Sequence, residues 1–79
     1  MSMISPDTFI DLRCKGKTYK ELLEIRDELL DEIYAFENGN ISPEARMIMP
    51  SPEVRYQVNL EYLGELCKLI SEAYNNEKV

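Results

Sequence analysis

The chain has 79 residues, 30% of them charged, and carries a formal net charge of −6 without a single histidine. A chain of this length forms one small domain that buries only about 60% of the surface of its unfolded state, so its own core is marginal. The acidic charge argues against nucleic acid and anionic membranes as partners, because both are bound through basic patches.

Ser-Pro followed by an acid occurs three times, at 5–7, 42–44 and 51–53, and each occurrence is typical of a helix start. The serine caps a free backbone N–H, proline fits the first helical position, and the acid lies at the positive end of the helix dipole. The first occurrence predicts a short helix over 6–14 and the last predicts a long helix over 52–75. The middle one predicts a single short turn in the link between the long helices.

A second long helix is predicted over 19–37. Thr18 and Glu21 have the spacing of a capping box at its start, and Gly39 follows its end, where a glycine takes the left-handed conformation. No run of alternating β-branched residues indicates a strand. We therefore expect an all-α fold: a helical hairpin of two long antiparallel helices with a short N-terminal helix.

The last helix has more apolar surface than one neighbouring helix can cover. At about 100° per residue its two apolar rows span roughly 180–200° of the helix, whereas a surface helix needs a stripe of only about 100°. The main seam is Tyr56, Leu60, Leu63, Cys67, Ile70 and Tyr74, and the second row, outside this seam, is Tyr62, Leu66, Leu69 and Ala73. Since the chain offers no disulfide framework, we expect two hairpins to form a homodimeric four-helix bundle. The residues assigned to self-association are Tyr56, Leu60, Leu63, Leu66, Cys67, Leu69, Ile70, Ala73 and Tyr74.

The helix over 19–37 is acidic opposite its apolar side, with like-charged i,i+4 pairs that each cost about 0.2–0.5 kcal/mol. This face suits a protein partner with a basic surface or a divalent cation, or it is a solvated face that keeps the protein soluble. The link carries a methionine-rich apolar run, which suits an adaptable binding surface or a cap over one end of the bundle. The candidate partner-binding residues are Glu24, Asp27, Glu28, Asp31, Met47, Ile48 and Met49.

No residue pattern indicates catalysis. Histidine, the commonest general base, is absent. Cys67 lies on an apolar seam as a small hydrophobe, whereas Cys14 has Arg13 and Lys15 beside it and is expected to be the more reactive thiol. We predict no catalytic residue, no metal ligand and no cofactor. The N-terminus lacks the pattern of a secretory signal and no run spans a bilayer, so we expect a cytoplasmic protein.

One spacing supports a competing interpretation. Glu21-Leu22-Leu23-Glu24 resembles the Glu-x-x-Glu pair with which the all-α nucleoside triphosphate pyrophosphohydrolases hold magnesium. That family adds a Glu-x-x-Asp pair on the next helix, so the resemblance implies a magnesium-dependent enzyme acting on nucleotides. This chain departs from the pattern in its last helix, where Glu61 and Glu65 stand at i,i+4 and no aspartate follows Val54.

The sequence as a whole favours a small non-enzymatic interaction module, an adaptor or regulatory subunit that self-associates through its apolar helix faces and binds another protein. The two alternatives are the magnesium-dependent pyrophosphohydrolase and a purely structural homo-oligomer without a further partner.

Overall fold

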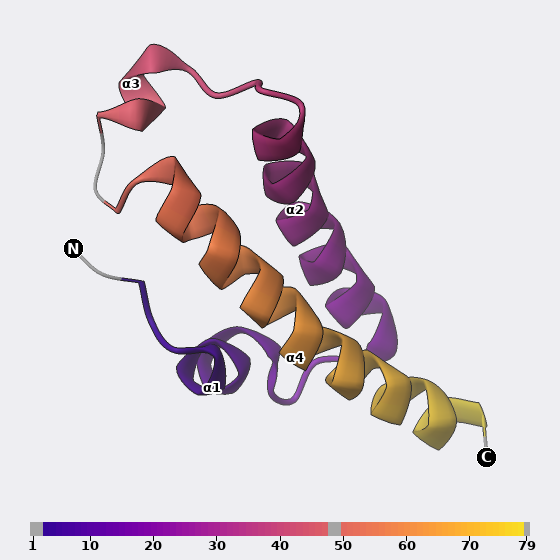
Figure 1. Cartoon of the computed structure of the whole chain (residues 1–79). Coiled ribbons are helices and arrows are strands. Elements are labelled where there is room, and N and C mark those ends of the chain that lie inside the picture. Colours follow the sequence, from indigo (N-terminus) through magenta and orange to yellow (C-terminus); the bar gives the residue numbers. More distant parts are fainter. Residues whose placement is uncertain (1–2, 48–49, 79) are drawn as a thin grey trace.

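The computed structural model describes residues 3–47 and 50–78, and within them the fold is all-α with no strand. The chain order is a short helix α1 (Pro6–Phe9), a π-helical turn η1 (Ile10–Cys14), a long helix α2 (Tyr19–Glu37), a single turn α3 (Pro43–Arg46) and a long helix α4 (Pro52–Lys78). In Figure 1, α2 and α4 lie side by side and run in opposite directions, and α1 lies against α4.

The N-terminal helix changes its geometry halfway. Ser5 caps α1 by accepting a hydrogen bond from the Thr8 N–H, as the sequence predicts. After Phe9 the helix widens into η1, where the Lys15 N–H donates to the carbonyl of residue 10, five residues earlier, at 2.8 Å. In an α-helix the residues three and four positions after Phe9 would share its face. The wider turn places Cys14 in the core instead, with only 1% of its surface exposed.

Helix α2 begins and ends at the predicted residues. The Thr18 hydroxyl accepts from the Glu21 N–H, and the Glu21 carboxylate accepts from the Thr18 N–H at 2.9 Å, which completes the capping box. At the other end Gly39 has a φ of 75°. Its N–H donates to Phe36 and the next N–H, at residue 40, donates to Ala35, so the last carbonyls of α2 are satisfied by a Schellman motif.

Helix α4 starts at the predicted Pro52 and continues to Lys78, beyond the predicted end at residue 75. Two aromatic pairs mark its alignment with α2. Phe36 and Tyr56 stack at one end of the hairpin with ring centroids 4.5 Å apart, and Tyr19 meets Tyr74 at the other end at 5.8 Å. Together with the helix directions in Figure 1, these contacts establish an antiparallel pairing of α2 and α4.

The core lies where α1 and η1 close over the α2–α4 pair, and it includes Leu22 and Leu29 from α2. The ring of Phe9 stacks on that of Tyr62 with centroids 4.2 Å apart and an interplanar angle of 4°. Tyr62 and Leu66 are buried, with Leu66 completely enclosed. The N-terminal helices thus cover part of the apolar surface of α4 that the sequence left without an intramolecular neighbour.

The assignment of Leu66 to self-association is therefore wrong, because this side chain belongs to the core of the single chain. The physical reason is that Phe9 and Cys14 supply the cover. These residues are far away in sequence, and their helix is too short for its own apolar pattern to indicate where it docks.

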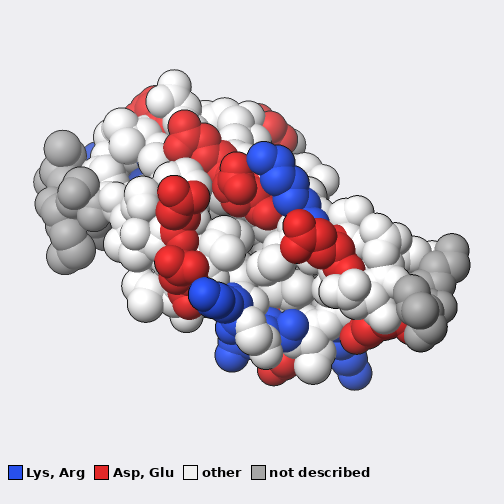
Figure 2. All heavy atoms as spheres, turned by 90° about the horizontal axis from the view of Figure 1, so that it is seen from below, with Lys and Arg blue, Asp and Glu red and all other residues white. Residues whose placement is uncertain are grey.

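The molecule is thin and elongated, with principal extents of 47 × 24 × 15 Å. Figure 2 shows one face of the molecule, and acidic side chains gather along the middle of this face. Among the described residues, no helix is both long and apolar enough to cross a membrane.

Candidate binding groove and open helix face

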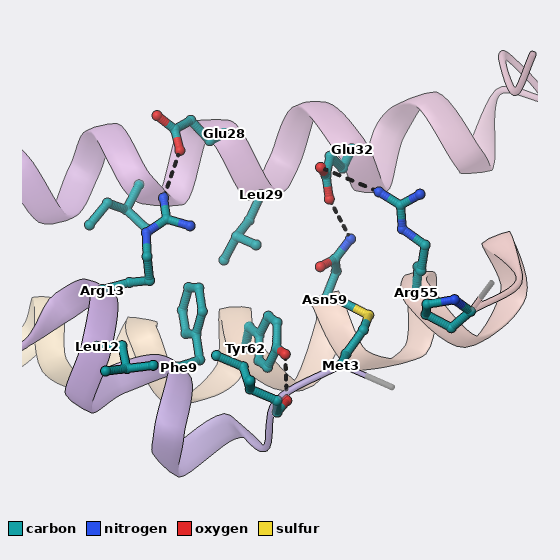
Figure 3. Close-up of a pocket in the computed structure, with 13 residues that line it drawn as sticks. Met3, Phe9, Leu12, Arg13, Glu28, Leu29, Glu32, Arg55, Asn59 and Tyr62 are labelled. Atoms are coloured by element: carbon teal, nitrogen blue, oxygen red, sulfur yellow. Dashed lines mark hydrogen bonds and ion pairs between the residues drawn. The ribbon is translucent and has the colours of Figure 1, made fainter. Parts of the chain in front are cut away.

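A groove of about 450 Å³ lies between the N-terminal segment and the hairpin (Figure 3). Its apolar lining includes Phe9 from α1, Ile25 and Leu29 from α2, and Tyr62 from α4, all of which also belong to the core. The groove exists because α1 docks chiefly on α4, so that its side chains meet α2 across a gap. A volume of this size falls within the range of sites that bind small molecules or side chains.

Two ion pairs cross this groove (Figure 3). Arg13 of η1 donates to the Glu28 carboxylate at 3.2 Å, and Arg55 of α4 lies 4.0 Å from Glu32. Glu32 also accepts a hydrogen bond at 2.8 Å from the side-chain amide of Asn59, which is only 5% exposed. All four charged side chains remain more than one-third exposed, so each ion pair contributes only about 0–1 kcal/mol.

The rim of the groove carries apolar side chains that water reaches. Leu12, which the π-helical turn leaves on the outside, is 71% exposed, and Ile4 is 42% exposed. Tyr62 anchors the N-terminal segment beside them by donating its hydroxyl to the Ile4 carbonyl. Burial raises the pKa of the Tyr62 hydroxyl above its ordinary value of 10.0, and the negative charge of Glu61 adds to this effect.

A second hollow of about 270 Å³ continues along α2 beyond the Glu32–Arg55 ion pair. Glu32, Arg55 and Asn59 line both hollows, so these three residues form a bridge between them. The second hollow extends past the stacked Phe36 and Tyr56. The two hollows therefore form one track along α2 that the bridge interrupts.

The predicted acidic residues of α2 do not act as a unit. Glu28 is at the groove and is paired with Arg13, while Asp27 is paired with Arg26 of the same helix at 3.1 Å. Glu24 and Asp31 are exposed and form no ion pair with any described residue. Glu21, the first acid of the Glu-x-x-Glu pair, is engaged in the capping box, and its hydrogen bond from the Thr18 backbone lowers its carboxyl pKa.

An exposed apolar row runs along α4, and its last member, Tyr74, meets Tyr19 of α2. Leu60, Cys67 and Tyr74 follow one another at seven-residue spacing and are all exposed. Cys67 stands five residues from the buried Tyr62, which places it about 140° around the helix from the groove side. Half-buried Leu63 and Ile70 lie next to this row and also pack against the core. We call these five residues, Leu60, Leu63, Cys67, Ile70 and Tyr74, the open face.

The open face contains most of the residues predicted for self-association. Of the remaining predicted residues, Tyr56 is stacked on Phe36 and donates to Glu37 at 2.6 Å, while Leu69 and Ala73 pack half-buried against the core. An added Cβ at Gly64, beside the open face, would meet no atom within 4 Å. Within the two apolar rows of α4, the exposed side chains are therefore those of Leu60, Cys67 and Tyr74, all from the main seam.

The two cysteines differ in accessibility, and the difference runs against the prediction that Cys14 is the more reactive thiol. Cys14 is buried, and this burial raises its thiol pKa although the nearby Arg13 charge acts in the other direction. Cys67 is exposed. The expectation that Cys14 is the more reactive thiol is wrong, because burial withdraws it from solvent and from its thiolate form.

The remaining predicted residues lie in the link. Met47 is 85% exposed, whereas Ile48 and Met49 lie outside the described residues.

Across the described parts of the chain, no three His, Cys, Asp or Glu side chains converge to hold a metal ion.

Sequence reasoning missed the groove residues Leu12, Arg55 and Asn59. Only Asn59 could have been noticed in the sequence, because it is a polar residue three positions before Tyr62 and so extends the second apolar row of the last helix.

The chain matches no family model, and comparisons with curated proteins and with solved structures likewise give no match.

Proposed function

We propose that this protein is a small non-enzymatic interaction module that self-associates through the open face of α4. The observation that carries the proposal is the exposed row on this face, with Leu60 42% exposed and Tyr74 45% exposed. Pairing of two such rows removes apolar surface from water at about 25 cal/mol per Å². Two hairpins joined in this way form a four-helix bundle, an arrangement that adds to the marginal core of one chain.

Three features near the row favour close contact with a second copy. Gly64 leaves space for a neighbouring backbone, and Cys67 and Ser71 beside it are small and exposed. No acid or base belongs to the open face itself, so two copies meet there without like charges in contact. Glu24 and Asp31 of α2, which form no ion pair with any described residue, stay outside this contact and can face a basic partner.

The test is the mass in solution, measured by light scattering after size exclusion at micromolar concentration. We expect about twice the 9.2 kDa chain mass for the native protein. Leu60→Asp places a charge on the open face, and we expect this variant to have the mass of a single chain. Leu12→Asp is the matched control, because it places the same charge on another exposed leucine, on the groove side of the molecule.

A native protein with the mass of one chain at every concentration would refute the proposal. So would a dimer that Leu12→Asp dissociates while Leu60→Asp leaves it intact. A mild oxidant provides an independent check, since Cys67 is the accessible thiol and should form a cross-linked dimer when two open faces meet.

A further inference from the structure

We infer that the groove along α2 binds an amphipathic helix of another protein whose polar edge is basic. The inference rests on the proposed role as an interaction module, and it concerns a surface separate from the open face.

The length of the groove favours a peptide over a small molecule. The α2 residues that line the two hollows run from Ile25 to Phe36, which at 1.5 Å per residue is about 16 Å, or three turns of helix. Partner helices that dock into grooves insert anchors at i, i+3, i+4 and i+7, and their anchors occupy a track of this length. The two hollows, of about 450 and 270 Å³, provide separate places for such anchors.

The bridge between the hollows is no barrier to this occupant. Arg55 is 4.0 Å from Glu32, and their side chains are 37% and 54% exposed, so the ion pair is weak in water. The hydrogen bond from Asn59 holds Glu32 in place without Arg55. Arg55 can therefore swing away while the Glu32 carboxylate stays at the groove to receive a cation of the partner.

Apolar surface and charge together define the chemistry of the partner. The 71% exposed side chain of Leu12 stands at the rim and would be covered by an apolar residue of the partner. On the α2 side of the groove the charge is acidic, because Glu24 and Asp31 are not paired within the described chain and extend the row that contains Glu28. A second copy of this chain, with its net charge of −6, would bring further acids to this row, whereas lysines would complement it.

The test uses a synthetic peptide of about 18 leucine and lysine residues with leucines at i, i+3, i+4 and i+7, labelled with fluorescein. Its binding to the full chain is followed by fluorescence anisotropy. A scrambled peptide of the same composition, which has the same charge but no apolar stripe, is the first control. We expect the ordered peptide to bind at least about tenfold more tightly than the scrambled one, because helix-in-groove binding depends on the spacing of its anchors.

Two protein variants locate the site. Leu12→Asp, at the rim of the groove, should weaken binding of the ordered peptide at least about tenfold, whereas Leu60→Asp, on the open face, should change it less than about twofold. Glu24→Gln combined with Asp31→Asn should weaken binding and reduce its dependence on salt.

Equal binding of the ordered and scrambled peptides, or no binding of either, would overturn the inference. The same holds if Leu60→Asp weakens binding and Leu12→Asp does not, which would place the peptide on the open face. Failure of self-association is recognised separately, because the mass measurement depends on Leu60 and is made without peptide. Circular dichroism of each variant confirms that its helices are intact.

Discussion

Tyr62 connects the N-terminal segment to the hairpin through two interactions of one side chain. Its ring stacks on Phe9 and its hydroxyl donates to the Ile4 carbonyl, so it holds residues on both sides of the Ser5 cap. Because Tyr62 also lines the groove, the position of the groove wall depends on this contact. One residue of α4 thus contacts both α1 and the segment that precedes it.

Removing the Tyr62 hydroxyl tests this connection. We expect Tyr62→Phe to lower the free energy of unfolding by about 1 kcal/mol, because the ring still stacks while the hydrogen bond is lost. Tyr34→Phe is the control, since Tyr34 is 53% exposed and its hydroxyl has no partner among the described residues. Urea unfolding followed by circular dichroism measures both values. Equal stability of the two variants would show that the bond to Ile4 adds nothing.

At the scale of the helices, the ends of α2 could be predicted from local sequence signals, whereas features that depend on long-range packing could not. The capping box of α2 and Gly39 after its end are local chemistry, and they define the helix as the structure has it. The π-helical turn after Phe9 has no such signal, because it depends on which side chain fits against α4. The groove combines three segments that are distant in sequence, so its position could not be predicted before the docking of α1 was known.

The capping box of α2 gives a prediction with a defined pH dependence. Thr18→Ala should lower the free energy of unfolding by about 1 kcal/mol, the usual cost of losing such a cap. The Glu21 pKa lies below its ordinary value of 4.5 in the folded state, chiefly because of the hydrogen bond from the Thr18 backbone. Its stabilising effect is therefore complete above about pH 4.5 and is lost as the pH falls through the folded value.

Glu21→Gln tests the pH dependence by urea unfolding between pH 7 and pH 3. The difference in unfolding free energy between the native protein and this variant should shrink as the pH falls. Glu24→Gln is the control, since no hydrogen bond to Glu24 is found in the described chain. A difference for Glu21→Gln that stays constant across this range would contradict the assigned role of the carboxylate.

The whole molecule is only 15 Å across in its thinnest direction, with its core on the side where α1 docks. If two chains associate through the open face, the folded state is stabilised by mass action. A tenfold increase in protein concentration then stabilises the dimer by about 1.4 kcal/mol, which raises the melting temperature by several degrees.

Thermal unfolding at several concentrations measures this dependence. The native protein and Leu12→Asp should both melt at higher temperature when more concentrated, whereas Leu60→Asp should melt at the same temperature throughout. A melting temperature of the native protein that does not vary with concentration would indicate that the single chain folds without help from a second one.

The buried amide of Asn59 has a consequence for the uniqueness of the fold. The apolar side chains of α2 and α4 recur every three or four residues, so the two helices could slide past each other by one turn and still mesh. Such a slide in one direction would set Asn59 against Phe36, which offers no acceptor, and would leave the amide buried without a partner at a cost of about 1–3 kcal/mol. The hydrogen bond to Glu32 therefore disfavours this shifted alignment, which apolar packing alone would tolerate.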